Sequence, residues 1–515
     1  MLAAPHQFDM AMPAPMHGAG ANRWNDSRRR PALVRRKNSP DQGNAGGVAG
    51  WLRQLPRNIA QNLPLNRTVS AHKPRLDSSD TGAFVNSNPS HKKGKLRRFK
   101  GYNMTISDTT LPHTAAVGAD WIDQRAMAYV PGFGLSSVFY TDAAIYARDV
   151  DRIFRRHWHC LTHESVVPKP HDFEVFAMAG EQVILSRDGR GQLHAMLNLC
   201  RHKGAEVCTE AKGNARAFVC PYHAWTYSND GALKAARLMP KTFKRKDYGL
   251  RKLHLRVVEG LIFVTFADDP LDFSAAEQLV HDTCGHYGWG KAKVVARQTY
   301  SIAANWKICI ENYVECYHCG PAHPEYSATH VLEQPPEEII ALNAAMAQRT
   351  RALGLDIAEC SPWEGSASGR EAIRSYRYAL KAGMQSASVD GTPVAPLMGG
   401  FRDYDGGITS LHFGGLTFMA AYPDHGVIYR FVPTGVDSCD MELIWLVAKD
   451  AVAGRDYDLD RLTWMWRVTS DEDKAIIETT ARGIRSHYFK PGPIAPMEAQ
   501  TQRYISWYLE ELLRP

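Results

Sequence analysis

The sequence predicts an α+β protein in which a small all-β domain precedes a larger domain that combines helices with an antiparallel sheet. The first observation is a run of short apolar segments between residues 174 and 266, separated by Gly, Asp and Asn turns, a texture typical of strands. The second is four apolar segments between 408 and 448, which predict antiparallel strands. The third is two stretches, about 470–486 and 496–513, which predict closing helices.

Further helices and one long loop complete this outline. Residues 141–159 carry apolar side chains at roughly helical spacing, with Thr141 and Asp142 as caps, and predict one amphipathic helix. Residues 306–318 predict a second helix, and residues 360–400 predict a loop-rich stretch.

Residues 1–103 differ in composition from the rest of the chain. They hold 18 Lys and Arg, 5 Asp and no Glu, a net charge of +13, so the remainder carries −6 of the total +7. Few apolar positions recur there, so this basic tail is predicted to be disordered. Three explanations stay open: a transit peptide, a nucleic-acid arm, or an over-extended gene start with Met104 as the true start.

The charge and hydropathy of the remaining chain exclude several classes of protein. Its mildly acidic balance gives no argument for nucleic acid as a partner. No apolar run approaches the roughly 18 to 20 residues that a membrane-spanning helix needs, and no secretory signal opens the chain. We therefore expect a cytoplasmic protein that does not insert into a membrane.

Four residues form a candidate metal motif: Cys200 and His202, followed after 17 intervening residues by Cys220 and His223. In a large chain without a secretory signal, clustered Cys and His indicate metal binding rather than a disulfide framework. A structural zinc site is the alternative. Zinc fingers pair C-x-x-C with H-x3-5-H, whereas each half here supplies one Cys and one His. Each half can therefore give its Cys to one metal atom and its His to another.

The two segments CRHKG and CPYHAW resemble the Rieske family, whose members hold a [2Fe-2S] cluster. The resemblance implies that the two cysteines bind one iron and the two histidines bind the other, which raises the reduction potential above that of plant-type ferredoxins. Two positions depart from the family pattern, because Lys203 replaces the usual Arg and Ala224 replaces the usual Gly. Neither removes a ligand, so they concern cluster tuning or loop contacts.

A second motif places Glu315, His318 and His323 in E-x-x-H-x4-H spacing. Glu315 and His318 are three residues apart, so they can touch on one helix face. His323 would point elsewhere on a continuous helix, but Gly320 and Pro321 are expected to break the helix and turn both imidazoles toward one ion. Alone, such a pair would more often be structural. It follows the first motif by about 90 residues, which makes it part of a larger pattern.

With both motifs, residues 104–515 resemble the oxygenase (alpha) subunit of Rieske non-haem iron oxygenases. This resemblance implies a helical arm at 104–155, a Rieske [2Fe-2S] domain at 156–270, and a catalytic domain of the helix-grip type with mononuclear Fe(II) at 271–515. The chain also lacks a dinucleotide or flavin fingerprint. Electrons are therefore expected from a partner NAD(P)H-dependent reductase that carries flavin or iron–sulfur groups.

The same resemblance implies the iron ligands, a facial triad of two imidazoles and one carboxylate that leaves positions open for O2. The imidazoles are those of His318 and His323, and the segment TSDEDKAIIE places the carboxylate at Asp473. Asp471 and Glu472 are neighbours that could be confused with it. A structural alternative also remains, because Ser470 and Asp473 fit a capping box at the start of a helix.

Glu315 matches the carboxylate that, in this family, bridges a cluster histidine to an iron-ligand histidine across a subunit boundary. The resemblance implies that Glu315 carries electron transfer from His223 of a neighbouring chain, and it implies an oligomer, expected to be a homotrimer. Most ring-hydroxylating relatives have Asp here. Glu is similar to the carnitine oxygenase group.

The segments ENYVECYHC and SHYFKPGPIAPMEAQTQRYISWY are similar to the Rieske enzymes of glycine betaine, carnitine and choline. They imply a monooxygenase that hydroxylates an N-methyl group of a small quaternary ammonium compound, so that formaldehyde is released. An aromatic-ring-hydroxylating dioxygenase is the alternative, and a pure electron carrier is a third, which the second motif argues against. Aromatic side chains would bind such a cation. The candidates, for which core packing is the simpler role, are Tyr313, Phe413, Phe418 and Tyr422.

Overall fold

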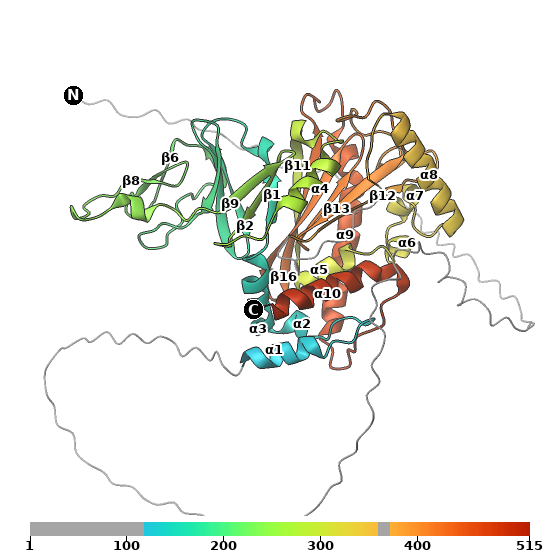
Figure 1. The fold of residues 1–515 in the computed structure, drawn as a ribbon, viewed down its shortest axis with the longest axis horizontal. Helices are drawn as coiled ribbons and strands as arrows, with labels where there is room; N and C mark the ends of the chain where they lie inside the picture. The colour runs from blue at the N-terminus through green and yellow to red at the C-terminus, as the bar shows by residue number, and fades with distance from the viewer. Residues whose placement is uncertain (1–117, 359–370, 515) are drawn as a thin grey trace, which may run out of the picture. The chain divides into compact units, whose positions relative to one another are not determined.

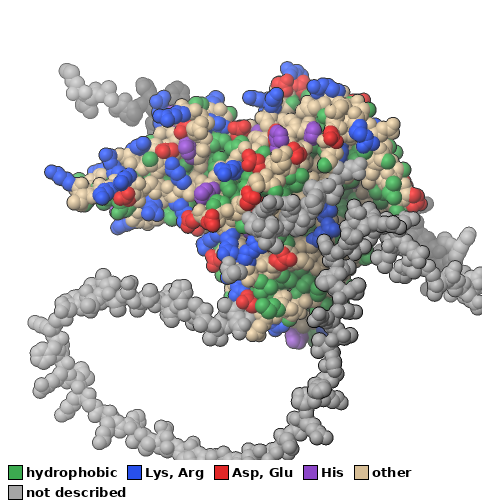
Figure 2. All heavy atoms as spheres, viewed as in Figure 1, with side chains coloured by type: hydrophobic (Ala, Val, Ile, Leu, Met, Phe, Trp, Pro, Cys, Tyr) green, Lys and Arg blue, Asp and Glu red, His purple; other side chains and the backbone are tan. Residues whose placement is uncertain are grey.

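A computed structural model of the chain describes residues 118–358 and 371–514 (Figure 1). The predicted disordered tail, residues 1–103, lies outside the described residues. Among the described helices, none combines the length and the hydropathy that a membrane-spanning segment requires. On the face drawn in Figure 2, charged side chains of both signs are interspersed with hydrophobic ones.

Four short helical segments precede the first strand: α1 (Gly118–Met127), α2 (Val138–Thr141), α3 (Ala143–Asp149) and a π-helical turn (Val150–Phe154). Asp142 caps α3, as predicted, because its carboxylate accepts hydrogen bonds from two backbone N–H groups of the first turn. The single helix predicted over 141–159 is wrong at both ends. Thr141 belongs to α2, and the helical segment ends at Phe154 because the next residues turn inward, where His157 Nδ1 lies 2.8 Å from the Glu371 carboxylate.

The predicted small β domain is confirmed, and its strands form three antiparallel sheets. In sheet order, the strands are β1 (His159–His163), β10 (Leu261–Thr265) and β9 (His254–Val258); β4 (Leu193–Leu197), β3 (Glu181–Arg187), β2 (Asp172–Met178) and β5 (Lys212–Asn214); and β6 (Ala217–Val219), β7 (Thr226–Ser228) and β8 (Leu233–Ala235). Cys200 and Cys220 belong to the same buried cluster as Phe173, Ile184 and Trp225. The loops that carry the first motif are therefore anchored in the interior of this domain.

The larger domain is built on one six-stranded antiparallel sheet. In sheet order, the strands are β11 (Ala292–Ile302), β16 (Ser438–Ala448), β15 (Gly426–Gly435), β14 (Thr417–Ala421), β13 (Gly407–Phe413) and β12 (Ile373–Ala379). The four strands predicted between 408 and 448 are confirmed. The loop-rich stretch predicted for 360–400 is wrong in part, because it contains β12. Polar Ser375 and Arg377 occupy inward positions of that strand, so the apolar alternation that signals a strand is missing.

The helices of this domain cover both faces of the sheet (Figure 1). They are α4 (Ser274–Cys284), α5 (Trp306–Tyr313), α6 (Cys319–Ala322), α7 (Pro324–Thr329), α8 (Pro336–Ala352), α9 (Leu459–Ile484) and α10 (Ala499–Leu513). Side chains alternate along β14: Phe418 and Ala420 pack into the cluster that includes residues of α5 and α9, whereas Met419 and Ala421 pack toward α4. The α5–α9 side is the one that carries the second motif.

Of the two predicted closing helices, α10 matches its prediction. The other, α9, begins at Leu459 rather than near Ser470, because Asp458 caps it by accepting a hydrogen bond from the N–H of Arg461 at 2.8 Å. Its buried residues recur every three or four positions, and Asp473 is one of them. Asp473 thus lies in the middle of a long helix that packs against α5 and α7.

Candidate metal centres

Two loops of the small β domain carry the first motif, and they share one hydrogen-bond pattern. The N–H groups of Cys200 and Cys220 each donate to the carbonyl oxygen five residues later, at 2.8 Å. The carbonyl oxygens of the same cysteines accept from the N–H four residues later, at 2.9 and 3.0 Å. The loops therefore have matched backbone turns, although the histidine follows the cysteine by two residues in the first loop and by three in the second.

The four side chains of the motif sort by depth. Cys200 and Cys220 are 3% and 2% exposed, whereas His202 is exposed and His223 is half-buried. The two imidazole rings lie 4.5 Å apart, and His202 stacks on the indole of Trp225. Two thiol groups on the interior side and two imidazoles on the outer side fit a binuclear cluster with a buried thiolate end and an accessible imidazole end.

Tyr227 is a neighbour of this motif that the sequence did not predict. Its hydroxyl lies 3.4 Å from Cys200 Sγ and accepts a hydrogen bond from the N–H of Arg201 at 3.2 Å. Tyr227 is fully buried. A hydroxyl directed at a ligand sulfur is one of the contacts by which a protein tunes an iron–sulfur cluster.

The two departures from the family pattern have different structural settings. Ala224 occupies the left-handed region with φ of 55°, and Gly204 has φ of 76° at the equivalent position of the first loop. A side chain at such a φ is strained, so Gly is the unstrained residue there. Lys203 lies on the surface, with its Nζ 5.7 Å from the centre of the Tyr222 ring.

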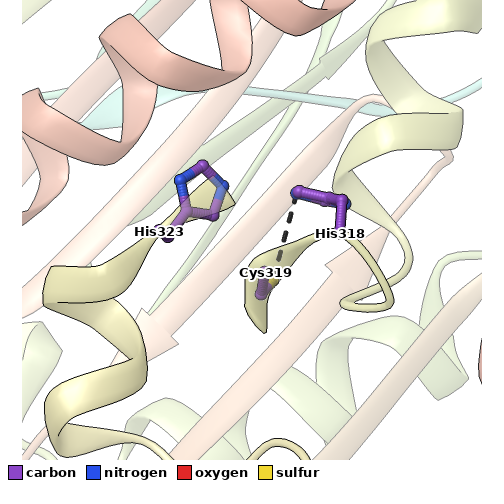
Figure 3. Close-up of side chains that lie close together, drawn as sticks. All are labelled: His318, Cys319 and His323. Carbon is purple, nitrogen blue, oxygen red and sulfur yellow. Dashed lines mark hydrogen bonds between the residues drawn. The ribbon is translucent and has the colours of Figure 1, made fainter. Parts of the chain in front are cut away.

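The second motif lies where the segment between α5 and α7 meets the middle of α9. His318 Nε2 and His323 Nε2 lie 3.3 and 3.1 Å from the same oxygen, Asp473 Oδ1. Figure 3 shows the two imidazoles on either side of Cys319. His323 is 3% exposed and Asp473 is 8% exposed. Two imidazoles and one carboxylate thus converge on one partly enclosed point.

The turn that brings the imidazoles together differs from the predicted one. The helix ends at Tyr313, before the motif, and Gly320 and Pro321 lie inside α6 rather than breaking a helix. Pro321 is tolerated because it stands in the first turn of α6, where backbone N–H groups have no partner within the helix. Glu315 and His318 touch, as predicted, but in the turn after α5 and not on a helix face.

The three acidic candidates on α9 differ in what their side chains face, which distinguishes the ligand candidate from its neighbours. Asp473 faces both imidazoles, Glu472 Oε2 lies 2.7 Å from the other ring nitrogen of His323, and Asp471 is exposed. The capping-box alternative for Ser470 and Asp473 is wrong, because α9 begins eleven residues before Ser470, at Leu459. The carboxylate of Asp473 is free to face the imidazoles.

The donor atoms have the spacing and charge that one cation requires. Ligands bound about 2.1 Å from a common ion lie about 3.0–3.4 Å apart at angles of 90–109°, and the separations from Asp473 Oδ1 are 3.1 and 3.3 Å. Burial lowers the pKa of His318, but hydrogen bonds to Asp473 and Glu315 outweigh this effect and raise the pKa to about 9. The carboxylates therefore favour a positive charge at this point.

Comparisons with known proteins agree with both sites. Residues 157–253 match the Rieske [2Fe-2S] domain, and residues 290–513 match the catalytic domain of the ring hydroxylating alpha subunit. The chain is 33% identical over 392 residues to the glycine betaine monooxygenase oxygenase subunit of Pseudomonas aeruginosa, an alignment that covers 74% of this chain and 89% of that protein. The chain belongs to the Rieske non-haem iron oxygenases.

Two further comparisons describe relatives of this Rieske oxygenase. The carnitine monooxygenase oxygenase subunit of Acinetobacter baumannii is 33% identical over 198 residues, which cover 37% of this chain and 52% of that protein. The solved structure of a quaternary ammonium Rieske monooxygenase in complex with L-carnitine has a TM-score of 0.56 at 19% identity, and the match covers 76% of this chain and 98% of that chain. The latter similarity supports the shared fold.

Membership of the family settles the cofactors of this Rieske oxygenase, a Rieske [2Fe-2S] cluster and a mononuclear iron. The first motif offers two thiols and two imidazoles, and the second offers two imidazoles and a carboxylate, which are the donor sets that these groups use. The residues present therefore fit both groups.

Glu315 is tied to the second site through His318. Its Oε1 lies 2.6 Å from His318 Nδ1, and its Oε2 accepts hydrogen bonds from the backbone N–H groups of Tyr317 and His318. This contact leaves His318 Nε2 as the nitrogen that faces Asp473. Tyr317, beside Glu315, is 53% exposed, so this turn reaches the protein surface.

Cys316 and Cys319 form a disulfide within the second motif. The sequence predicted metal binding rather than cross-linking for the clustered cysteines, and this pair is an exception. The other cysteines of the described residues, Cys200 and Cys220 among them, form no disulfide.

A cavity of about 380 Å³ opens beside the imidazoles of His318 and His323 in the Rieske oxygenase. Its described lining includes no Lys or Arg, and its only carboxylates are those of Glu315 and Asp473. The aromatic side chains that line it are Tyr313, Tyr326, Tyr376, Tyr378, Phe418, Tyr429 and Trp466.

Two of the four aromatic candidates from the sequence reach this cavity. Tyr313 and Phe418 line it, whereas Phe413 packs against Phe263 and Phe273 on the α4 side of the sheet. Tyr422 is fully buried, with its hydroxyl 2.7 Å from His330 Nε2. Sequence spacing could not find the other aromatics, because they converge from α7, β12, β15 and α9, which are far apart in the chain.

Proposed function

We propose that this chain is the oxygenase component of a multicomponent system that N-demethylates a small quaternary ammonium compound such as glycine betaine. The observation that carries the proposal is the aromatic cavity beside the two imidazoles. A quaternary ammonium group cannot donate hydrogen bonds, so aromatic faces and nearby carboxylates are the groups that stabilise it. Because the described lining of the cavity includes no Lys or Arg, no positively charged side chain in that lining repels the cation.

The same cavity suits the carboxylate end of a betaine. Asn343, Gln500 and the neutral imidazole of His412 are polar groups in its wall. Burial lowers the pKa of His412 to about 3, so the ring carries no charge at neutral pH and can donate or accept a hydrogen bond. Amides and a neutral imidazole can orient a carboxylate without repelling the cation.

We assign Cys200, His202, Cys220 and His223 to the cluster, and His318, His323 and Asp473 to the mononuclear iron. When bound, the two groups supply one-electron transfer and the activation of O2. The neighbouring carboxylates of Glu315 and Glu472 each contact the second nitrogen of an imidazole. Such contacts fix the tautomer and orientation of a ligand histidine and raise its basicity.

The two histidines of the cluster motif lie where electrons could be exchanged with other chains. His202 is exposed and His223 is half-buried, so the imidazole end of the cluster is accessible. We infer that an NAD(P)H-dependent reductase delivers electrons there, and that Glu315 receives them from His223 of a neighbouring chain in a homotrimer. The domain boundaries 104–155, 156–270 and 271–515, and a cytoplasmic location, belong to the same proposal.

A single turnover tests the substrate class without a reductase. The enzyme with both metal groups is reduced chemically and exposed to O2 with glycine betaine, carnitine, choline or an aromatic acid, and products are identified by mass spectrometry. We expect stoichiometric formaldehyde from a betaine, since hydroxylation of an N-methyl group gives a hemiaminal that collapses. A diol or phenol from the aromatic acid without formaldehyde would instead establish the ring-hydroxylating alternative.

A further inference from the structure

The disulfide between Cys316 and Cys319 brackets His318, a residue of the proposed iron site. Cys319 is 6% exposed and lines the cavity, and its Sγ lies 3.9 Å from His318 Nε2 (Figure 3). One ligand atom each from Cys319, His318 and His323 lie within 4.8 Å of one another. Cys316 does not belong to that group.

The Cys319 sulfur lies close enough to the imidazoles to serve as a fourth donor atom. A sulfur and a nitrogen bound to one tetrahedral zinc ion at ordinary bond lengths are about 3.6 Å apart. The observed 3.9 Å separation from His318 Nε2 therefore needs only a small adjustment for both atoms to reach one ion. In the disulfide, the sulfur is covalently occupied by Cys316 and is not a thiolate, the form in which cysteine binds metals.

We propose that Cys319 is a redox-gated metal ligand. With the disulfide closed, the site offers two imidazoles and the Asp473 carboxylate. Opening the disulfide adds a thiolate as a fourth protein donor beside His318 and His323. The inference rests on the assignment of these three residues to the mononuclear site.

The opening step balances through thiol–disulfide exchange with a dithiol reductant. The reductant gives two electrons and two protons, becomes a disulfide itself, and leaves Cys316 and Cys319 as thiols. Cys319 then loses its proton to solvent as its sulfur binds the metal. The reverse exchange with an oxidised dithiol closes the bond, so both directions use reagents of one chemical class.

The added sulfur changes the metal preference and the number of open positions. Thiolate is a soft donor that suits zinc, whereas two imidazoles and a carboxylate with open positions suit Fe(II) and its reaction with O2. Four protein donors also close a site that substrate and O2 must reach. The closed disulfide is thus the state that keeps this site in its iron-binding, open form. In a reducing compartment a disulfide is more often transient or sensing than structural.

Cobalt X-ray absorption tests the inference, because the iron atoms of the cluster are silent at the cobalt edge. The protein with its [2Fe-2S] cluster is loaded with Co2+ at the mononuclear site before and after reduction by a phosphine, which brings no sulfur of its own. We expect only nitrogen and oxygen neighbours in the oxidised protein and one sulfur at about 2.3 Å after reduction. Mass spectrometry of alkylated peptides confirms the state of the 316–319 bond in each sample.

Two matched variants separate the roles of the two cysteines. Cys316→Ser leaves Cys319 permanently free, so a cobalt–sulfur bond is expected with or without reductant. Cys319→Ser leaves no sulfur at that position, so none is expected in either state. Reduced wild-type protein that binds Co2+ through nitrogen and oxygen alone overturns the redox gate but not the proposed iron site. Failure of the oxidised and reduced proteins alike to take up Co2+ overturns the site itself, and the gate with it.

Discussion

Ala224 shows at the scale of one residue how the cluster loops accommodate an unusual sequence. Its φ of 55° costs an L-residue about 1–2 kcal/mol, which a Gly would not pay. Gly also makes the unfolded chain more flexible, and this reduces the gain from the substitution by about 0.4–1 kcal/mol. We therefore expect Ala224→Gly to stabilise the cluster domain by about 0.5–1 kcal/mol. The temperature at which the visible absorption of the cluster disappears measures this effect.

Two substitutions in the other cluster loop control for this prediction. Gly204→Ala places a side chain at φ of 76° and should lower the same temperature, although its Cβ would meet nothing closer than 3.7 Å. Ala205→Gly, at a residue without a positive φ, should also lower it, since it only adds freedom to the unfolded chain. A lower temperature for Ala224→Gly would show that the strain argument fails at this loop.

Asp473 supplies the second prediction at this scale. It is the only one of the three neighbouring carboxylates that faces both imidazoles. Asp473→Ala should therefore reduce bound iron from about three atoms per chain to about two, because the cluster keeps its own pair. Asp471→Asn, at an exposed position two residues away, should keep all of it. Metal analysis together with the visible spectrum distinguishes the two results. Loss of iron in Asp471→Asn but not in Asp473→Ala would show that Asp471, not Asp473, is the carboxylate ligand.

The residues of the two candidate sites could be predicted from the sequence to different degrees, for a physical reason. Cys200, His202, Cys220, His223, Glu315, His318 and His323 lie in short motifs whose spacing carries information. Tyr227, Glu472 and the cavity aromatics act through contacts between distant segments, and their types are common in protein cores. The disulfide was missed because C-x-x-C here overlaps a metal motif.

At the scale of elements, strands that contain an apolar run were predicted and a more polar strand was missed. β14 and β16 contain runs of apolar residues, whereas β12 buries Ser375 and Arg377, and Arg377 is held by ion pairing with Asp405. A buried ion pair offsets the cost of an inward charge only in the folded protein. The sequence of such a strand therefore resembles a loop.

The start of α9 gives the prediction at this scale. The carboxylate of Asp458 accepts from the N–H of Arg461, and substitution of such a cap by Ala costs about 0.5–2 kcal/mol. Asp458→Ala should lower the thermal midpoint of the catalytic domain accordingly. Ser470→Ala, at the start expected from the sequence, removes no cap and should not show the capping effect. A larger loss for Ser470→Ala than for Asp458→Ala would contradict this start of the helix.

At the scale of the whole molecule, one buried histidine joins three distant parts of the chain. His157, before β1, lies 2.8 Å from Glu371, before β12, and 3.2 Å from Glu511 in α10. All three side chains are almost fully buried. Removing the His157 imidazolium takes the positive charge away from the buried carboxylates of Glu371 and Glu511. Breaking a buried ion pair in this way costs about 3–5 kcal/mol. His157 is thus a link between the entry of the β domain and two segments of the catalytic domain that are far apart in the sequence.

The charge of His157 makes this link depend on pH. Burial lowers its pKa, but Glu371 and Glu511 outweigh that effect and raise the pKa to about 9. Because the folded pKa lies above the ordinary value of 6.5, the stabilisation is complete below about 6.5 and is lost as the pH rises through about 9. The thermal midpoint of the wild type should therefore fall between pH 7 and 10. The thermal midpoint of His157→Gln should be lower than that of the wild type at pH 7 and should fall less between pH 7 and 10.

His281→Ala is the control, since the pair that His281 forms with Glu259 is on the surface and contributes about 0–1 kcal/mol. Equal slopes for the wild type and His157→Gln would show that the histidine is uncharged in the folded protein.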